Sequence, residues 1–443
     1  MDKLVIEGGR RLTGTVEISG SKNSCLPILA ASLLTSERSV IKGVPRLADI
    51  STMSKILRNL GVRVDQRDDT LSILPGDYQG RTAPYELVSA MRASVCVLGP
   101  LLARFGRARV SFPGGCVIGP RPIDLHLKGL RALGAEIKIE GGYLIAETKG
   151  LKGCTVYLGG HFGSSVLATA NIMMAATLAK GKTIIENAAC EPELVDLAKF
   201  LNAMGAAITG YNTHRIEIEG VESLKGAEHN LIPDRIEAGT YIVAAAITRG
   251  DILLKNVIPE QITAIIDKLS EVGVSIKQEK DGLRVKVDRK LSSVDVTTLP
   301  YPGFPTDMQA QMMALMCTVG GISVITEKVY PERFIHISEL NRMGADIILE
   351  GATAIIKGSK DLSGAPVMAS DLRASAALIL AGLVAQGRTE VNRVYHLDRG
   401  YERLEDKLAG LGAKVWREKS RRTTIDTTEY REKERVYGSS YQA

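Results

Sequence analysis

The hydrophobic and polar positions of this chain repeat as one unit of about 70 residues. A bulky apolar residue, a glycine and a small residue recur at Gly61, Gly134, Gly205, Gly273, Gly344 and Gly412, with glycine intervals of 73, 71, 68, 71 and 68. Helical periodicity precedes each glycine, and an alternating strand pattern follows it, as at 136–139. We therefore predict that each glycine ends a helix, where a left-handed backbone is favoured.

An alanine-rich apolar segment and a β-branched segment come earlier in every unit. Segments that are apolar all round are typical of helices buried on every side. We expect such helices at 28–34, 95–103, 172–179, 241–247, 309–317 and 374–384. Strands are expected at 39–41, 108–110, 183–185, 251–253, 323–325 and 389–391. With the second helix and its strands, this pattern predicts six βαβαββ subdomains and an α/β fold.

The two ends of the chain complement each other. The start has a strand pair, 3–6 and 12–16, like the pair at 143–145 and 151–156 before a later apolar helix, and the last unit stops near 416–426 without its full complement. We infer one domain of three units at 22–229 and a second domain of residues 1–21 together with 230–419. Two chain crossings would join them, which suits a hinge and a ligand cleft. Residues 420–443 are charged and aperiodic, which predicts a solvated tail.

Composition narrows the class of protein. The 443 residues are 45% hydrophobic and 24% charged, which is ordinary for a globular chain too long for one core. No apolar run is long enough to span a membrane, and the start lacks a signal-peptide pattern. Six scattered cysteines without a CxxC pair indicate a reducing cytoplasm and argue against disulfides or structural zinc. A net charge of +6 suits small anionic substrates better than nucleic acid. We expect no metal.

A glycine- and proline-rich stretch at 113–125 carries the first candidate chemistry. Gly114 and Gly115 precede Cys116, and Arg121 follows five residues later, so the stretch is expected to be a loop. A fixed positive charge near a thiol lowers the thiol's pKa and can also grip phosphate or carboxylate. This pattern suggests a catalytic lid. The alternative is a turn with a buried, inert cysteine.

Polar residues also cluster where the apolar helices are expected to begin. They are Lys22, Asn23, Arg92, Ser164, Ser165, Asp234, Arg235, Asp307 and Arg373. Helix N-termini carry free N–H groups and a partial positive charge, so they bind phosphate. Ordinary capping would explain Asp307 and Ser164. It explains the cations poorly, because positive charge is disfavoured at that end unless an anion binds there.

Six motifs together resemble a known family. They are SGSKN at 19–23, MRAS at 91–94, GGCVIGPRPID at 114–124, PGFPTDMQ at 302–309, DLRAS at 371–375 and DRGYE at 398–402. In this order they are similar to the UDP-N-acetylglucosamine 1-carboxyvinyltransferases, a family of enolpyruvyl transferases, over about residues 1–418. The resemblance implies a two-domain inside-out α/β barrel. It also implies transfer of the enolpyruvyl group of phosphoenolpyruvate to the 3-hydroxyl of UDP-N-acetylglucosamine, with release of phosphate by addition and elimination. That reaction is the first committed step of peptidoglycan synthesis.

The resemblance also implies a role for each matching residue. The phosphoenolpyruvate site would be Lys22, Asn23, Arg121, Arg333, Arg373 and Arg399, with Arg333 and Arg373 on the carboxylate side. The UDP-N-acetylglucosamine site would be Arg92, Arg121, Pro122, Ile123, Asp124, Leu125, Ser164, Ser165, Asp307 and Val329. Cys116 would be the general acid, the site of a covalent adduct and the target of fosfomycin, while Asp307 would accept the hydroxyl proton. Lys22 and Arg399 would stabilise the leaving phosphate. No cofactor is implied.

Two departures and three alternatives accompany this reading. Leu167 stands where the family pattern has glycine, in a loop at 161–169 expected to touch the nucleotide diphosphate, and the charged tail lengthens the usual end. The nearest rival is a shikimate enolpyruvyl transferase, against which Cys116 and Asn23 argue. A regulatory duplicate without turnover is supported by Leu167 alone. An RNA-end-processing relative would show a basic stripe, which is not evident. We expect a monomer or a weak oligomer.

Overall fold

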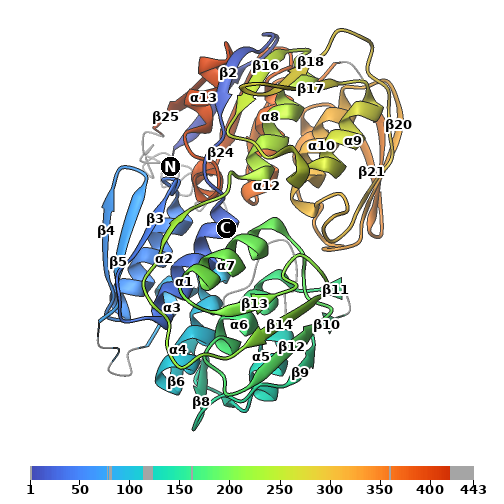
Figure 1. Cartoon of the computed structure of the whole chain (residues 1–443). Helices are drawn as coiled ribbons and strands as arrows, with labels where there is room; N and C mark the ends of the chain where they lie inside the picture. Colours follow the sequence, from blue (N-terminus) through green and yellow to red (C-terminus); the bar gives the residue numbers. More distant parts are fainter. Residues whose placement is uncertain are drawn as a thin grey trace, which may run out of the picture.

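The computed structural model describes residues 2–76, 78, 82–112, 123–160, 163–358 and 361–419. The predicted sites Cys116, Arg121 and Pro122 and the tail at 420–443 lie outside the described residues. In Figure 1 the elements drawn in blue to green gather in one half of the molecule, and those in yellow to red gather in the other. The blue N-terminal strands lie with the yellow and red half.

Three main sheets surround the first half. Their strand orders are β15-β3-β5-β4, β6-β8-β7 and β13-β14-β12-β9. The strands are β3 (Ser39–Lys42), β4 (Arg63–Arg67), β5 (Thr70–Leu74), β6 (Arg107–Ser111), β7 (Glu136–Glu140), β8 (Tyr143–Glu147), β9 (Thr155–Tyr157), β12 (Lys182–Glu186), β13 (Ala207–Thr209), β14 (Arg215–Glu219) and β15 (Glu228–Asn230). A small hairpin pairs β10 (Gly159–Gly160) with β11 (Gly163–Ser164).

Three four-stranded sheets surround the second half. Their orders are β17-β18-β16-β2, β19-β20-β22-β21 and β23-β24-β1-β25. The strands are β1 (Lys3–Glu7), β2 (Thr13–Glu17), β16 (Asp251–Lys255), β17 (Ser275–Glu279), β18 (Gly282–Lys286), β19 (Val296–Thr298), β20 (Gly321–Glu327), β21 (Asp346–Glu350), β22 (Thr353–Gly358), β23 (Pro366–Met368), β24 (Arg388–Asn392) and β25 (Lys414–Glu418).

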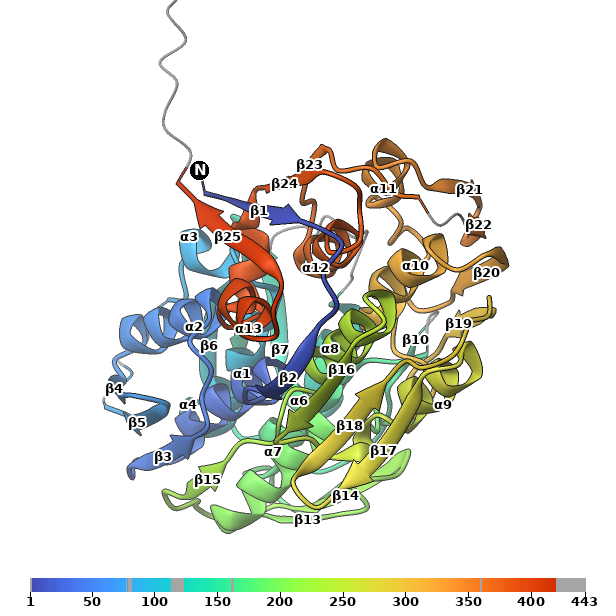
Figure 2. The ribbon, with the colours of Figure 1, turned by 90° about the horizontal axis from the view of Figure 1, so that it is seen from above.

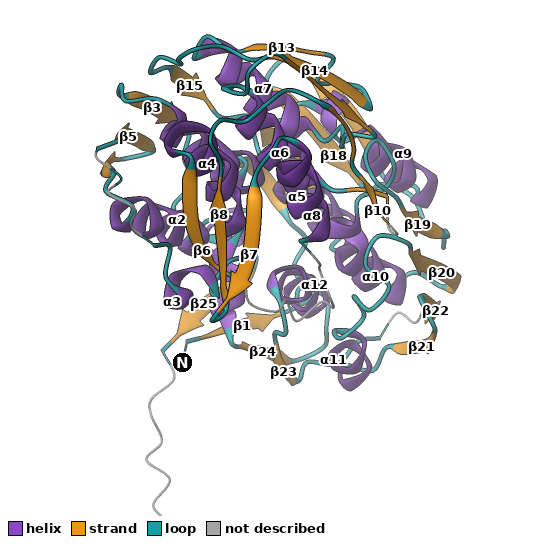
Figure 3. Cartoon of the chain, turned by 90° about the horizontal axis from the view of Figure 1, so that it is seen from below, coloured by secondary structure: helices purple, strands orange, loops and turns teal. Residues whose placement is uncertain are grey.

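The first helix of every unit is buried, as its apolar pattern predicts. These helices are α1 (Lys22–Ala31), α4 (Leu98–Phe105), α6 (Val166–Ala176), α8 (Arg235–Ile247), α10 (Gln309–Cys317) and α12 (Leu372–Gly382). All nine residues of α10 are buried, which requires protein on every side of that helix. Figure 3 shows strands toward the outside and these helices toward the inside.

The second helix of each unit ends at the recurring glycine. These helices are α2 (Ala48–Asn59), α5 (Asp124–Ala132), α7 (Pro192–Ala203), α9 (Thr263–Val272), α11 (Ile337–Arg342) and α13 (Leu404–Gly410). The six glycines have φ between +91° and +113°, a left-handed conformation that glycine adopts without steric cost. The predicted helix ends are therefore confirmed. Short helices are α3 (Tyr85–Val88), η1 (Ser32–Leu34), η2 (Arg92–Val97), η3 (Pro259–Gln261), η4 (Thr306–Met308) and η5 (Val394–Arg399).

The chain passes between the halves at two adjacent crossings. Strand β2 lies parallel to β16, and the chain then enters α1 of the other half; it returns between β15 and α8. The crossings are hydrogen-bonded to each other, from the Ser21 amide to the Ile232 carbonyl and from the Asp234 amide to the Ser19 carbonyl, both at 2.8 Å. Figure 2 shows β2 beside β16. At Gly20 two backbone segments of the chain are too close for a side chain, because a Cβ would lie 1.9 Å from the Gly43 carbonyl oxygen.

The buried hydrophobic residues form two clusters. One extends from Cys25 to Leu224. The other combines the N-terminal strands, from Leu4 to Ile18, with residues between Ile236 and Val415. We propose on this basis a domain at 22–229 and a second at 1–21 with 230–419. Among the described helices, none is both long and apolar enough to cross a bilayer.

Candidate active site

The polar residues expected at helix starts do lie there. Lys22 opens α1, Arg92 opens η2, and Arg373 is the second residue of α12. Asp307 lies in η4, directly before α10, and Ser165 is the N-cap of α6. The fold thus brings cations to helix N-termini. Both the cations and the helix ends are positive, so these places favour a bound anion.

Lys22 and Arg399 meet at one carboxylate, although they come from different halves of the molecule. Lys22 Nζ lies 3.1 Å from Asp49 Oδ2, and Arg399 Nε lies 2.9 Å from Asp49 Oδ1. Both Lys22 and Asp49 are buried. Asp49 was not predicted as a site residue, because an aspartate in the first turn of a helix is explained by the helix dipole alone.

Asp307 is held by the other predicted cation pair. Its Oδ1 lies 2.8 Å from Arg333 and its Oδ2 lies 3.0 Å from Arg373. Burial by itself would raise the pKa of Asp307, but the two guanidinium groups hold that pKa well below its usual value. The side chain is therefore an ionised carboxylate at neutral pH.

Arg373 is buried and only partly hydrogen-bonded. Its exposed fraction is 2%, and its guanidinium stacks over the ring of Tyr401 at 5.3 Å. Burial works against the charged form, yet the facing Asp307 outweighs it and raises the pKa of Arg373. Nε and Nη1 of Arg373 have no hydrogen-bond partner within the described part of the chain. A buried guanidinium with free donors is suited to bind an anion.

Glu327 organises the segment that carries Val329 and Arg333. One carboxylate oxygen accepts from Thr298 Oγ1 at 2.6 Å and from the Val329 amide at 2.8 Å. The other accepts from Thr306 Oγ1 at 2.9 Å, and Thr306 Oγ1 accepts from Arg333 at 3.1 Å. Glu327 is only 1% exposed. Glu327 is not among the predicted site residues, since a glutamate at the end of a strand usually faces solvent.

The described residues among those predicted to bind the nucleotide sugar lie in the first half, in η4 at Asp307, and in the segment at Val329. Ser164 pairs with Gly159 in the β10–β11 hairpin, and Ser165 Oγ accepts from the Ala168 amide at 3.3 Å, an ordinary cap. Leu167, which replaces the expected glycine, is half-buried and packs against the first-half core. Its side chain thus has a packing role within α6.

His126 is the third residue of α5, directly after Asp124 and Leu125, and Ile123 is the N-cap of this helix. Asn171 donates from Nδ2 to His126 Nδ1 at 3.1 Å, while its Oδ1 accepts from the Gly99 amide at 2.7 Å. Burial, reinforced by the nearby charge of Arg92, lowers the pKa of His126 to about 3. The ring is therefore neutral, with its proton on Nε2.

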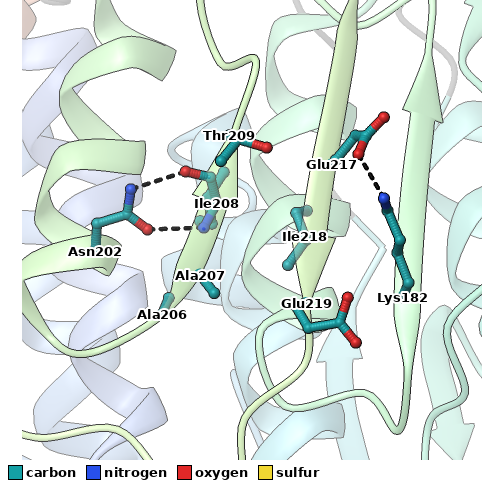
Figure 4. A pocket seen from close by; sticks show the side chains of 9 residues that line it. All are labelled: Lys182, Asn202, Ala206, Ala207, Ile208, Thr209, Glu217, Ile218 and Glu219. Atoms are coloured by element: carbon teal, nitrogen blue, oxygen red, sulfur yellow. Dashed lines mark hydrogen bonds and ion pairs between the residues drawn. The ribbon is translucent and has the colours of Figure 1, made fainter.

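A cavity of about 250 Å³ lies on the outer sheet of the third unit, away from these groups. Figure 4 shows its lining: Asn202 exchanges two hydrogen bonds with the Ile208 backbone, and Lys182 pairs with Glu217 at 2.6 Å. Asn202, Lys182 and Glu217 thus already have hydrogen-bond or ion-pair partners, and none of the predicted site residues lines this cavity.

The sequence of this chain is similar to those of known proteins. Residues 6–408 match the family model of EPSP synthase, 3-phosphoshikimate 1-carboxyvinyltransferase. The chain is 57% identical to a UDP-N-acetylglucosamine 1-carboxyvinyltransferase of Myxococcus xanthus, covering 95% of this chain and all of the relative. It is 56% identical to UDP-N-acetylglucosamine 1-carboxyvinyltransferase 1 of Caldanaerobacter subterraneus, covering 94% of this chain and 99% of the relative.

Solved structures agree on the fold. The enolpyruvyl transferase NikO from Streptomyces tendae superposes with a TM-score of 0.83 at 25% identity, covering 94% of this chain and 98% of that one. An EPSP synthase from Acinetobacter baumannii gives a TM-score of 0.73 at 18% identity, covering 95% and 100%. The expected enolpyruvyl transferase fold is confirmed. With these relatives matched over nearly its whole length, the chain belongs to the enolpyruvyl transferase family, in the group of UDP-N-acetylglucosamine 1-carboxyvinyltransferases.

Proposed function

We propose that this protein transfers the enolpyruvyl group of phosphoenolpyruvate to the 3-hydroxyl of UDP-N-acetylglucosamine and releases phosphate. The observation that carries this proposal is the presence of two cation pairs, each held by one carboxylate: Lys22 with Arg399, and Arg333 with Arg373. Phosphoenolpyruvate has two anionic groups, a phosphate and a carboxylate. Two fixed cation pairs match that charge pattern.

Each cation pair takes one end of the donor. Lys22, Arg399 and Arg121 hold the phosphate, with Asn23 nearby, and stabilise the charge that develops as it leaves; Arg121 lies outside the described residues. Arg333 and Arg373 hold the carboxylate. The support for the second assignment is that Arg373 is buried and keeps two nitrogens, Nε and Nη1, without a partner among the described residues.

Asp307 accepts the proton of the sugar 3-hydroxyl in this mechanism. While both guanidinium groups bind it, the lowered pKa makes it a weak base. A donor carboxylate that binds Arg333 and Arg373 would draw them away from Asp307. The freed carboxylate then has a higher proton affinity, so donor binding and base activation are linked.

The reaction proceeds by an addition followed by an elimination. The hydroxyl oxygen bonds to C2 of the enolpyruvyl group, its proton passes to Asp307, and Cys116 protonates the methylene carbon to a methyl group. The Cys116 thiolate takes a proton back from that methyl group, which restores the double bond as the C2–O bond to phosphate breaks and the phosphate leaves. Cys116 also carries the covalent adduct with phosphoenolpyruvate.

The acceptor site combines both halves of the molecule. Arg92, the residues from Ile123 to Leu125, and the serine pair Ser164 and Ser165 lie in the first half, and Val329 lies in the second. We place the reaction in the cytoplasm, at the first committed step of peptidoglycan synthesis and hence of cell-wall growth, shape and division. The five described cysteines are free thiols, in keeping with a reducing compartment.

Phosphate release tests the proposal directly. The purified protein with phosphoenolpyruvate should release phosphate when UDP-N-acetylglucosamine is added and should form the enolpyruvyl nucleotide sugar, detected by mass spectrometry. Shikimate 3-phosphate is the matched acceptor, because the family model carries that enzyme's name. Release with shikimate 3-phosphate alone would assign the chain to the rival reaction.

A further inference from the structure

Asp49 holds the two cations that face the donor phosphate, while occupying only one donor group on each. It binds Lys22 through one N–H of the ammonium group and Arg399 through Nε alone. An ammonium group has three N–H donors and a guanidinium has five. The terminal nitrogens of Arg399, which form the two-pronged grip on phosphate, are not used by Asp49.

The contact joins the two halves of the molecule. Lys22 opens α1 and Asp49 lies in the first turn of α2, both in the first half, whereas Arg399 ends η5 in the second. The Asp49 side chain is 5% exposed and that of Lys22 is 9% exposed, but that of Arg399 is 35% exposed. Asp49 thus lies at the buried end of this three-residue cluster, and Arg399 lies at the end that solvent reaches.

Two opposing effects follow from a carboxylate at this position. Its negative charge weakens the attraction of the cluster for phosphate. Lys22 and Arg399 repel each other, and the carboxylate keeps this repulsion from turning the partly exposed Arg399 side chain into solvent. Arg399 is therefore already in place, so less side-chain entropy is lost when phosphate binds. The second effect dominates here, because the cluster keeps a net positive charge and Asp49 binds Nε of Arg399, not its terminal nitrogens.

We propose that Asp49 is a positioning residue for the donor phosphate, which aligns Lys22 with Arg399 across the two halves. The proposal rests on the proposed function for the identity of the donor. It goes beyond that function because Asp49 would raise the affinity for phosphoenolpyruvate without itself contacting phosphoenolpyruvate.

Steady-state kinetics of Asp49→Asn provide the first test. We expect the KM for phosphoenolpyruvate to rise at least about tenfold, because the two cations are no longer aligned, with the KM for UDP-N-acetylglucosamine changed less than about twofold. Asp49→Glu, which keeps the charge, should recover part of the loss. Glu402→Gln is the matched control: Glu402 also joins the halves, accepting from the Arg46 amide at 3.1 Å, without touching Lys22 or Arg399.

A double-mutant cycle separates positioning from general destabilisation. If Asp49 acts through Arg399, Asp49→Asn combined with Arg399→Lys should be no worse for phosphoenolpyruvate than Arg399→Lys alone. Fully additive losses would overturn the proposal. So would an equal rise in both KM values, or a loss matched by Glu402→Gln.

Calorimetry with inorganic phosphate makes the test independent of turnover. We expect phosphate to bind more weakly to Asp49→Asn than to the wild-type protein. Tighter binding would overturn the proposal and make Asp49 a competitor of phosphate. If the wild type releases no phosphate with UDP-N-acetylglucosamine, the proposed function fails, whereas this binding comparison still decides the role of Asp49.

Discussion

At the residue scale, the site depends on two carboxylates that each lie between two cations. Asp49 is buried and bridges Lys22 and Arg399, and Asp307 bridges Arg333 and Arg373. Asp307 takes terminal nitrogens of its arginines, while Asp49 takes Nε of Arg399. The first arrangement suits a carboxylate that is released when an anion binds. The second suits one that stays in place.

Asp307→Asn should fold normally and lose turnover by about 100-fold or more, because an amide cannot accept the hydroxyl proton. Single-turnover phosphate release measures the loss. Binding of phosphoenolpyruvate should be retained, since both arginines remain and no internal carboxylate competes with the donor. Near-normal turnover would remove Asp307 from the mechanism and leave it a counter-ion.

His126 makes stability depend on pH. The unfolded chain protonates this residue below about pH 6.5, but the folded protein does so only near pH 3. The free energy of unfolding therefore falls as pH drops through this window, by about 1.4 kcal/mol per pH unit from this group. Relative to wild type, His126→Gln should gain about 2 kcal/mol between pH 7.5 and pH 5 in urea unfolding. Lys128→Gln, on the same helix, is the control and should show no such gain.

Fosfomycin should modify Cys116 and leave the buried thiols unmodified. Burial raises the pKa of Cys96 and of Cys317 to about 12, and raises that of Cys25 further, so these thiols are poor nucleophiles. Peptide mass spectrometry after treatment, with and without UDP-N-acetylglucosamine, identifies the modified residue. Adducts on Cys154 or Cys190 with Cys116 unmodified would contradict the assignment.

At the element scale, each unit depends on a glycine that ends its second helix. Gly205 follows α7 with φ +103°, and an added Cβ would meet no atom within 4 Å, so only the backbone conformation opposes a larger residue. Gly410 also has open space around it, but it lies within α13 and lacks a positive φ. Because neither position is crowded, the comparison of the two isolates the strain of the left-handed backbone at Gly205.

Gly205→Ala should therefore lower the free energy of unfolding by about 1–2 kcal/mol, the cost of a left-handed alanine. Gly410→Ala is the matched control and should leave stability unchanged or raise it by up to about 1 kcal/mol, because alanine favours the helix. Thermal unfolding of both variants measures the difference. Equal effects at the two positions would contradict the conformational explanation.

At the scale of the whole molecule, two adjacent crossings and a few ion pairs connect the halves. Besides the Asp49–Arg399 contact, Arg235 at the start of α8 binds Glu193 of α7 at 2.9 Å. Such an arrangement allows the halves to close on a ligand about the paired crossings. The proposed acceptor site needs groups from both halves, so closure and acceptor binding should be coupled.

Small-angle scattering tests this closure. The radius of gyration should fall when UDP-N-acetylglucosamine is added, because the nucleotide sugar contacts both halves. Shikimate 3-phosphate, which the proposed site does not recognise, should leave the radius unchanged. An unchanged radius with the nucleotide sugar, at concentrations where calorimetry shows binding, would exclude a large closure.

The repeating unit, the buried helices and the helix ends were predictable from the sequence. These features are local: an alanine-rich segment must be enclosed, and a glycine such as Gly134 can take φ +96° where other residues are strained. The residues expected at helix starts, such as Lys22 and Arg373, were found for the same reason. Their site roles stay predictions, as do those of Cys116, Arg121 and Pro122 outside the described residues.

Which of these residues meet depends on how the chain folds in three dimensions. Asp49 and Arg399 are 350 positions apart, and no periodicity relates them. Glu327 likewise gained its role from Thr298 and Thr306, which approach it only when β19 and η4 pack beside β20. Charge pairing in a buried site depends on distance in space, and that distance is set by how the two halves fold and cross.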